Sequence, residues 1–160
     1  MQGVEVGADW NFYRGFSLFG NLTWIEGEVD TVVGLETRRE PISIMPPLSG
    51  LVGVRSESDD KRFWAEAVAQ FARRQDQLSP GDIANTERIP PGGTPGYDVY
   101  TVRAGWQVTP QWKLTAAVEN IRDEDYRIHG SGLNEPAPTS FSPPRFASSV
   151  ESLGHVRLTE

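Results

Sequence analysis

The feature of this sequence that most constrains its fold is an alternation of apolar and polar residues with a period of two. In residues 97–108, an apolar series runs from Tyr100 to Val108, and a more polar series from Thr101 to Gln107 fills the positions between. Successive side chains of a β-strand point to opposite faces, whereas an amphipathic helix repeats its apolar residues every three to four positions. The alternation therefore predicts strands with one apolar face and one polar face.

The same pattern recurs from one end of the chain to the other. The predicted strands are residues 3–13, 16–26, 48–57, 62–74, 97–108 and 112–120. The fourth is rich in alanine and also permits a helix, but a helix would place Phe63 on the same side as Glu66 and Gln70, so a strand is favoured. In the second strand, Phe19 and Ile25 depart from the alternation.

The connections between these strands alternate between short and long. The short ones are residues 14–15, 56–61 and 109–111, and the long ones are about 26–45, 75–96 and 121–140. Transmembrane β-barrels have short turns at one end and long loops at the other, and their strands need about ten residues to cross a bilayer. Aromatic residues lie beside the short turns, as in an interfacial girdle: Trp10, Phe12, Tyr13, Phe16, Trp106 and Trp112.

We therefore expect an all-β fold, an antiparallel up-and-down meander of about six to seven strands that forms part of a larger transmembrane β-barrel. Its apolar face would contact outer-membrane lipid. The alternative is a soluble all-β ligand-binding module in which the same aromatic residues form an ordinary core.

Composition excludes several other classes. The length of 160 residues requires no more than one domain, and a net charge of −7 argues against nucleic acid as a partner. With no cysteine, the chain has no disulfide, thiolate metal site or thiol nucleophile. No apolar run reaches the roughly 20 residues of a membrane helix, and the first residues lack the pattern of a signal peptide.

The stretch "DEDYRIHGSGLNEP", residues 123–136, has the residue types of an active site. Ser131, His129 and either Asp123 or Asp125 could supply a triad, but no "GxSxG" motif is present. The run 123–125 lacks the spacing of a calcium loop, so a solvated acidic turn is favoured over a cation site. The Gly- and Pro-rich residues 80–96 fit no phosphate-binding template. We expect no catalytic, cofactor-binding or metal-binding residues, and no enzyme activity.

Residues 116–136, "AAVENIRDEDYRIHGSGLNEP", resemble the closing region of TonB-dependent outer-membrane receptors. The residues that carry the resemblance are Asn120, Asp123 and Tyr126, which match the family's Asn-aliphatic, acidic and Tyr signature. Weaker likenesses are the strand opening "GVEVGADW" and the Pro-Pro entry of "PPLSGLVGVR".

The resemblance implies a barrel of about 22 strands filled by an amino-terminal plug. Such receptors import ferric siderophores, cobalamin or similar scarce nutrients with energy from the TonB system. Residues 1–136 would be carboxy-terminal strands of such a barrel in the outer membrane of a Gram-negative cell. The plug, the TonB box and the signal peptide have no counterpart in this sequence, so the segment is expected to need the remaining barrel and the plug for transport.

Arginines in or next to the long loops are candidate contacts to an anionic siderophore, because a guanidinium suits carboxylate recognition. They are Arg73, Arg74, Arg88, Arg122 and Arg127. The alternative is that they are solvated charges or partners of nearby acids. By strand parity, Arg55, Arg103 and Glu119 would face the lumen and pair with the plug or a neighbouring strand.

The last residues, 137–160, depart from the family pattern. They contain Pro138, Pro143 and Pro144 and show little alternation, which argues against a central strand. We expect a divergent tail that is disordered or forms a poor last strand. A frameshift near residue 137 is one hypothesis for this divergence.

Overall fold

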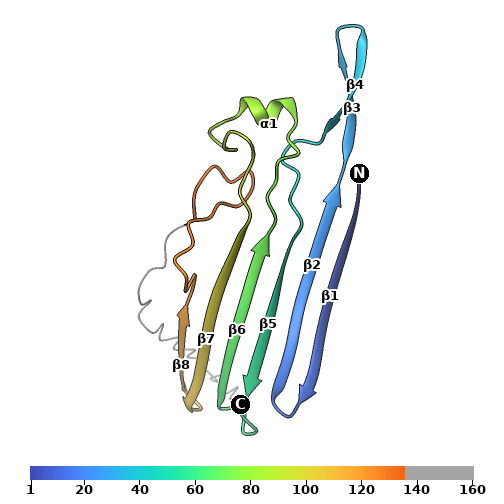
Figure 1. The fold of residues 1–160 in the computed structure, drawn as a ribbon. Coiled ribbons are helices and arrows are strands. Elements are labelled where there is room, and N and C mark those ends of the chain that lie inside the picture. The colour runs from blue at the N-terminus through green and yellow to red at the C-terminus, as the bar shows by residue number, and fades with distance from the viewer. Residues whose placement is uncertain (136–160) are drawn as a thin grey trace, which may run out of the picture.

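A computed structural model of the chain describes residues 1–135 (Figure 1). Its elements are β1 (Gln2–Tyr13), β2 (Phe16–Glu26), β3 (Glu28–Val33), β4 (Glu36–Pro41), β5 (Ser49–Glu57), β6 (Phe63–Ala72), α1 (Pro80–Ala84), β7 (Tyr97–Thr109) and β8 (Trp112–Val118). The predicted tail, residues 137–160, lies outside the described residues.

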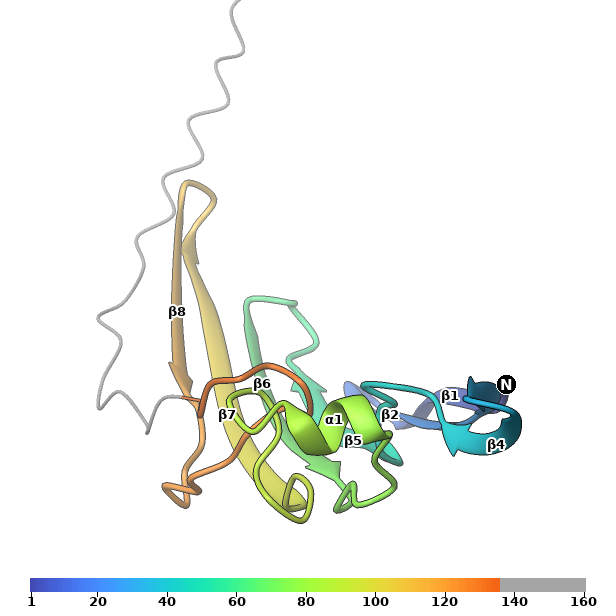
Figure 2. The same ribbon diagram turned by 90° about the horizontal axis from the view of Figure 1, so that it is seen from above.

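The described residues form an open antiparallel sheet of six strands in the order β1-β2-β5-β6-β7-β8. Every neighbouring pair is antiparallel, so the sheet is the predicted up-and-down meander. The bounds agree with the predicted strands to within two residues. Seen from above, the strands follow an arc that does not close on itself (Figure 2). The fold is therefore a curved segment of a β-barrel wall.

The strand register gathers the apolar residues on one face of this sheet. One row of paired residues crosses all its strands: Trp10, Leu18, Val54, Ala67, Val102 and Val118. The large members of this row are between 40% and 63% exposed, although a soluble sheet would bury them. No second layer of described residues covers this face. Its exposure fits contact with lipid.

The same row is staggered relative to the strand ends. Leu18 is near the short-turn end of β2, whereas Val118 is the last residue of β8, at the long-loop end. Strands that close into a barrel must tilt, and the tilt shifts the register from strand to strand in this way. The stagger is therefore a geometric property of a barrel wall.

Aromatic residues bound the apolar face at both ends. At the short-turn end, the rings of Trp10, Phe12 and Phe16 follow one another at centroid distances of 5.6 and 6.2 Å. At the long-loop end of β2, Trp24 is on the same face as Phe16, eight residues further along. That separation is about 26 Å along the strand. It is close to the apolar band of about 25 Å in outer-membrane barrels.

Two large aromatic rings lie on the polar face, and one of them, Phe19, is a residue that departs from the alternation. Phe19 pairs with Gly53, and Trp64 pairs with Gly105, in neighbouring strands. A Cβ at either glycine would overlap the opposite aromatic ring. Each large ring therefore covers the backbone of a glycine on the neighbouring strand. Glycine weakens a strand because it has no side chain to pack, and the ring shields its backbone.

The long connections contain more structure than the sequence predicted. The expected loop at 26–45 is wrong in part, because β3 and β4 form a two-stranded hairpin beyond β2, with a turn at Gly34, whose φ is 68°. The connection 75–96 contains α1. β8 ends at Val118, so the signature residues from Asn120 onward follow the strand and do not belong to it. Among the described residues, no helix is long and apolar enough to cross a membrane.

Arginine on the apolar face should destabilise the membrane-inserted sheet. Val102→Arg puts a guanidinium between the levels of Tyr100 and Trp106, and we expect the free energy of unfolding to fall by about 2–4 kcal/mol. Thr101→Arg is the matched control, because its side chain is on the polar face and a change within about 0.5 kcal/mol is expected. Urea unfolding in lipid vesicles measures both values. Equal losses would contradict the assignment of the faces.

Candidate ligand-binding site

The long connections pack against one another at one end of the sheet, where α1 also lies (Figure 1). Most of the described side chains that are almost fully buried are in these connections. They include Met45, Gln75, Ser79, Asp82, Ile89, Thr94 and Asn120. The buried side chains therefore hold the connections in place around any ligand site at this end of the sheet.

Asp82 joins the connection before β5 to the connection after β6. Ser79 caps α1, and the Ser79 hydroxyl and the Asp82 carboxylate each accept the other's backbone N–H in a capping box. The carboxylate also accepts the Ser43 hydroxyl at 2.6 Å and the Ile44 amide at 3.2 Å. Burial alone would raise the pKa of Asp82, but the hydrogen bonds from Ser43, Ser79 and Ile44 outweigh it and lower the pKa.

Two contacts join the connection after β6 to the one after β8. Arg88, one of the predicted ligand contacts, donates from Nε and Nη2 to the carbonyl of Gly130 at 3.1 and 2.9 Å. Thr94 Oγ1 lies 2.9 Å from His129 Nδ1. Burial lowers the pKa of His129, and the charge of Asp82 opposes this only in part. The neutral imidazole has a buried Nε2 atom with no hydrogen-bond partner among the described residues.

The signature residues shape the turn after β8. Asn120 is in the left-handed region with φ of 50°, and its side-chain amide donates to Glu124 O at 2.8 Å and accepts from Glu124 N at 2.9 Å. Asp123 is also left-handed, with φ of 56°. The ring of Tyr126 packs on Tyr97 at 4.6 Å, and burial, followed by nearby negative charge, raises the pKa of Tyr126. These residues therefore set the path of the chain as it leaves the sheet.

A pocket of about 160 Å³ lies where this turn meets the strand ends. Its floor contains Ser49, Ala72 and Tyr97, which form one cross-strand row of β5, β6 and β7. By strand parity this row continues the polar face of the sheet. The other lining residues are Pro46, Pro47, Arg73, Thr94, Pro95, Arg127, Ile128 and His129.

Arg73 and Arg127 are the predicted contacts that line this pocket. Arg127 donates from Nε to Asn134 Oδ1 at 2.8 Å. The two terminal nitrogens of its guanidinium take no part in that bond. The side chain of Arg73 is exposed and makes no hydrogen bond or ion pair with another residue in the described part of the chain. Both cations are therefore open to an incoming group.

The remaining predicted contacts have local partners. Arg74 donates to the carbonyl of Gly92 at 2.5 Å and lies 3.5 Å from Asp76. Arg122 forms an ion pair with Asp98 at 2.7 Å. Asp98 belongs to the series of β7 that carries the apolar face, so this pair is on the opposite side of the sheet from the pocket. The role of these arginines in binding stays a prediction.

Charged residues on the polar face form a chain of ion pairs that runs across β5, β6 and β7 to Glu119, just after β8. Glu66 is 3.8 Å from Arg55 and 3.9 Å from Arg103, and Arg103 is 3.5 Å from Glu119. The guanidinium of Arg55 also lies 4.8 Å from the centre of the Trp64 ring. The neighbouring strands thus supply the partners that were predicted for Arg55, Arg103 and Glu119.

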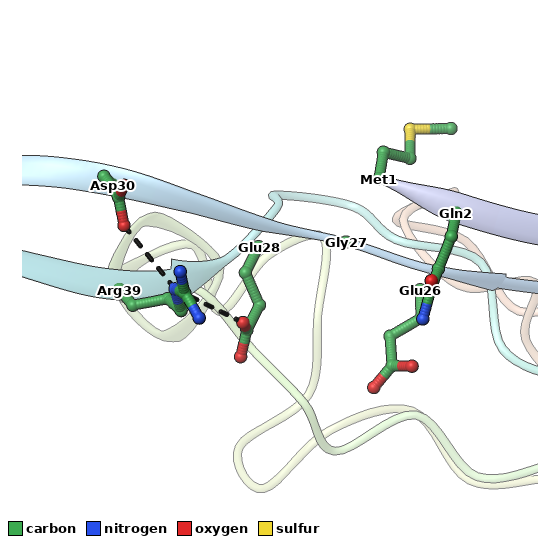
Figure 3. Close-up of a pocket in the computed structure, with 7 residues that line it drawn as sticks. All are labelled: Met1, Gln2, Glu26, Gly27, Glu28, Asp30 and Arg39. Atoms are coloured by element: carbon green, nitrogen blue, oxygen red, sulfur yellow. Dashed lines mark ion pairs between the residues drawn. The ribbon is translucent and has the colours of Figure 1, made fainter.

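A second hollow, of about 410 Å³, lies beside the edge strand β1 and the base of the β3–β4 hairpin. Figure 3 shows Arg39 between Glu28 and Asp30, and both carboxylates are 3.6 Å from the Arg39 Nε atom. Glu26 points into the same hollow from β2. Acidic side chains outnumber the arginine in this hollow, whereas the smaller pocket has arginines and no acid, so only the smaller pocket suits an anion.

The catalytic and calcium interpretations of residues 123–131 find no support in the geometry. Ser131 Oγ donates to Leu133 O at 2.9 Å, while His129 contacts Thr94, so serine and histidine do not form a hydrogen-bonded pair. Within residues 1–135, the structure has no cluster of three or more His, Asp or Glu side chains that could hold a metal ion.

Loss of the Asp82 charge should loosen the contact between the loops. Because the folded-state pKa of Asp82 is depressed, its stabilisation is present above about pH 4 and is lost as the pH falls through the folded pKa. Protection of the Ile44 amide from hydrogen exchange should therefore decline at acid pH. In Asp82→Asn, the opening free energy should already be lower at pH 7, by about 2–3 kcal/mol. The exposed Asp76→Asn is the control, and equal effects of both variants would refute the role of Asp82.

Comparison with known proteins agrees with this architecture. Residues 1–121 match the family model described as TonB dependent receptor-like, beta-barrel. Among solved structures, the chain is similar to "Copper transporter OprC", with 19% sequence identity and a TM-score of 0.68 over 85% of this chain and 21% of that chain. The chain thus spans about a fifth of the length of that structure. No curated protein sequence matches it significantly. The chain belongs to the TonB-dependent receptor-like β-barrel family.

Proposed function

We propose that this chain supplies the carboxy-terminal strands of an outer-membrane receptor that takes up a ferric siderophore or a similar scarce nutrient with energy from the TonB system. The observation that carries this proposal is the two-sided sheet, whose apolar face is exposed between aromatic rows and whose other face is polar. A wall of this kind separates lipid from an aqueous lumen.

The alternative, a soluble all-β ligand-binding module, fits the exposed face poorly. Leu22, Val52 and Val102 are each more than 40% exposed, and they are members of one continuous surface. Removal of that surface from water would contribute a favourable free energy of about 25 cal/mol per Å² of apolar area. A soluble module would use this free energy in its own core, whereas a barrel wall gains it from lipid.

The unpaired edges of the sheet indicate which further parts of a barrel it needs. Strands β1 and β8 are at the two edges of the sheet, and unpaired backbone groups cost several kcal/mol each in lipid. We infer that further barrel strands pair with both edges. The polar face, with its chain of ion pairs from Arg55 through Glu66 and Arg103 to Glu119, would face the plug, through which the TonB system would act. On this proposal the segment does not transport alone.

The cargo we propose is an anionic complex. Arg73 and Arg127 line a pocket on the polar side of the sheet, at the end where the long loops gather. In the proposed orientation this end is outside the cell, so a ligand would reach these cations before it entered the lumen. Copper is the cargo in the name of OprC, and a likeness at 19% identity shows the fold alone. We also propose that the chain has no enzyme activity, because its role is to enclose a transport path.

Surface labelling should establish the proposed orientation. The chain has no cysteine, so Leu35→Cys at the tip of the β3–β4 hairpin and Asp59→Cys in the β5–β6 turn each introduce a new thiol. With the complete natural reading frame expressed, a membrane-impermeant maleimide should label Leu35→Cys in intact cells and Asp59→Cys only after lysis. The unsubstituted protein gives the background. Labelling of both sites in intact cells would contradict a barrel that spans the membrane.

Transport itself should depend on both the receptor and TonB. Cells that express the reading frame should accumulate radioactive iron from at least one member of a panel of ferric siderophores, and deletion of TonB should abolish the accumulation. A protein with the β8 residues deleted is the control for barrel assembly. If TonB deletion leaves accumulation unchanged, or if neither ferric siderophores nor cobalamin enter, the proposed function is wrong.

A further inference from the structure

The pocket above Ser49, Ala72 and Tyr97 has the size of a single ring. Its volume is about 160 Å³. Engineered protein cavities of about 150 Å³ bind benzene. Much of the lining is apolar, from three prolines, Ala72, Ile128 and the ring of Tyr97. Such walls suit a flat ring better than an extended polar chain.

The charge of the lining is unusual for this protein. Arg73 and Arg127 line the pocket, and no aspartate or glutamate does. The chain as a whole has 22 acidic residues and a net charge of −7, so two arginines without an acid depart from its general character. Outside the lining, the charge of Asp82 acts on His129, and the Asp82 carboxylate already accepts hydrogen bonds from Ser43 and Ser79. An entering group with one negative charge would therefore meet cations that no lining carboxylate neutralises.

The third feature is an atom that lacks a partner. His129 Nδ1 contacts the Thr94 hydroxyl, whereas Nε2 is buried and unbonded among the described residues. A buried polar atom without a hydrogen bond costs about 1–3 kcal/mol. Because the hydroxyl of Thr94 can donate or accept, the neutral imidazole can present Nε2 either as an acceptor or as a donor. His129 lines the pocket, so a ring bound there would lie beside the imidazole, although Nε2 itself is covered by protein atoms.

We propose that this pocket is a subsite for a planar ring that bears a carboxylate. The ring would lie between the prolines and Tyr97, and the carboxylate would be held by the guanidinium groups of Arg73 and Arg127. The assignment of this group to the transported complex rests on the proposed function. The binding of the ring acid itself does not require transport.

Binding of small probes tests the subsite. The product of the complete natural reading frame, purified in detergent, is titrated by calorimetry with benzoate, benzyl alcohol and acetate. Benzoate has the ring and the acid, whereas each of the others has one of them. We expect saturable binding of benzoate, about tenfold tighter than of either partial probe. Equal binding of benzyl alcohol would show that the arginines are not used, and no saturable benzoate binding would overturn the proposal.

Two arginine variants and one control locate the site. Arg73→Gln changes a side chain with no bond in the described part, so it tests the charge with little effect on the loops. Arg127→Gln also removes the contact to Asn134. Each should weaken benzoate about tenfold, equivalent to about 1.4 kcal/mol. Arg38→Gln, on the exposed hairpin strand β4, should change it by less than about twofold. If both Arg73→Gln and Arg127→Gln bind benzoate with unchanged affinity, the proposed site is wrong.

Histidine spectroscopy adds a readout at the pocket itself. The His129 ring resonance, identified by its absence in His129→Gln, should shift as benzoate saturates the protein. Binding without that shift would place benzoate elsewhere and overturn the proposal. If benzoate binds here but no siderophore enters cells, the subsite stands and the transport function fails. If uptake is TonB-dependent but benzoate does not bind, the reverse conclusion holds.

Discussion

The backbone hydrogen-bond register of the sheet is the constraint on which the other features depend. It aligns one row from Trp10 to Val118, and a slip of one residue in any strand would transfer that strand's apolar residues to the polar face. The register also brings Arg55, Glu66 and Arg103 side by side. Lipid contact on one face and ion pairing on the other are therefore fixed by the same set of bonds.

Much of this sheet could be predicted from the sequence, because a period of two is visible residue by residue. The strand that was ambiguous, β6, has three of its four alanines on the apolar face, where small residues are tolerated. The departure at Phe19 could not be interpreted in advance, since its reason is Gly53 on the neighbouring strand. The β3–β4 hairpin was missed because β4 carries charged or polar residues on both sides and the valines of β3 keep no strict alternation.

The candidate site was less predictable. Its floor comes from the ends of β5, β6 and β7, and its walls come from the connections around Pro46, Thr94 and His129. Sequence reasoning placed the five arginines in or next to the long loops. It could not separate the pair at the pocket from those with local partners, since that depends on how the loops pack. A signal for Asp82 was present, because Ser79 and Pro80 precede it at the spacing of a helix cap.

The contacts made by Asp82, Arg88 and His129 have a dynamic consequence. Here the connection after β6 is bonded to both of its neighbours, through Ile44 on one side and Gly130 on the other. Such a unit opens cooperatively, because release of one segment breaks bonds that hold the others. These three connections would then open and close together.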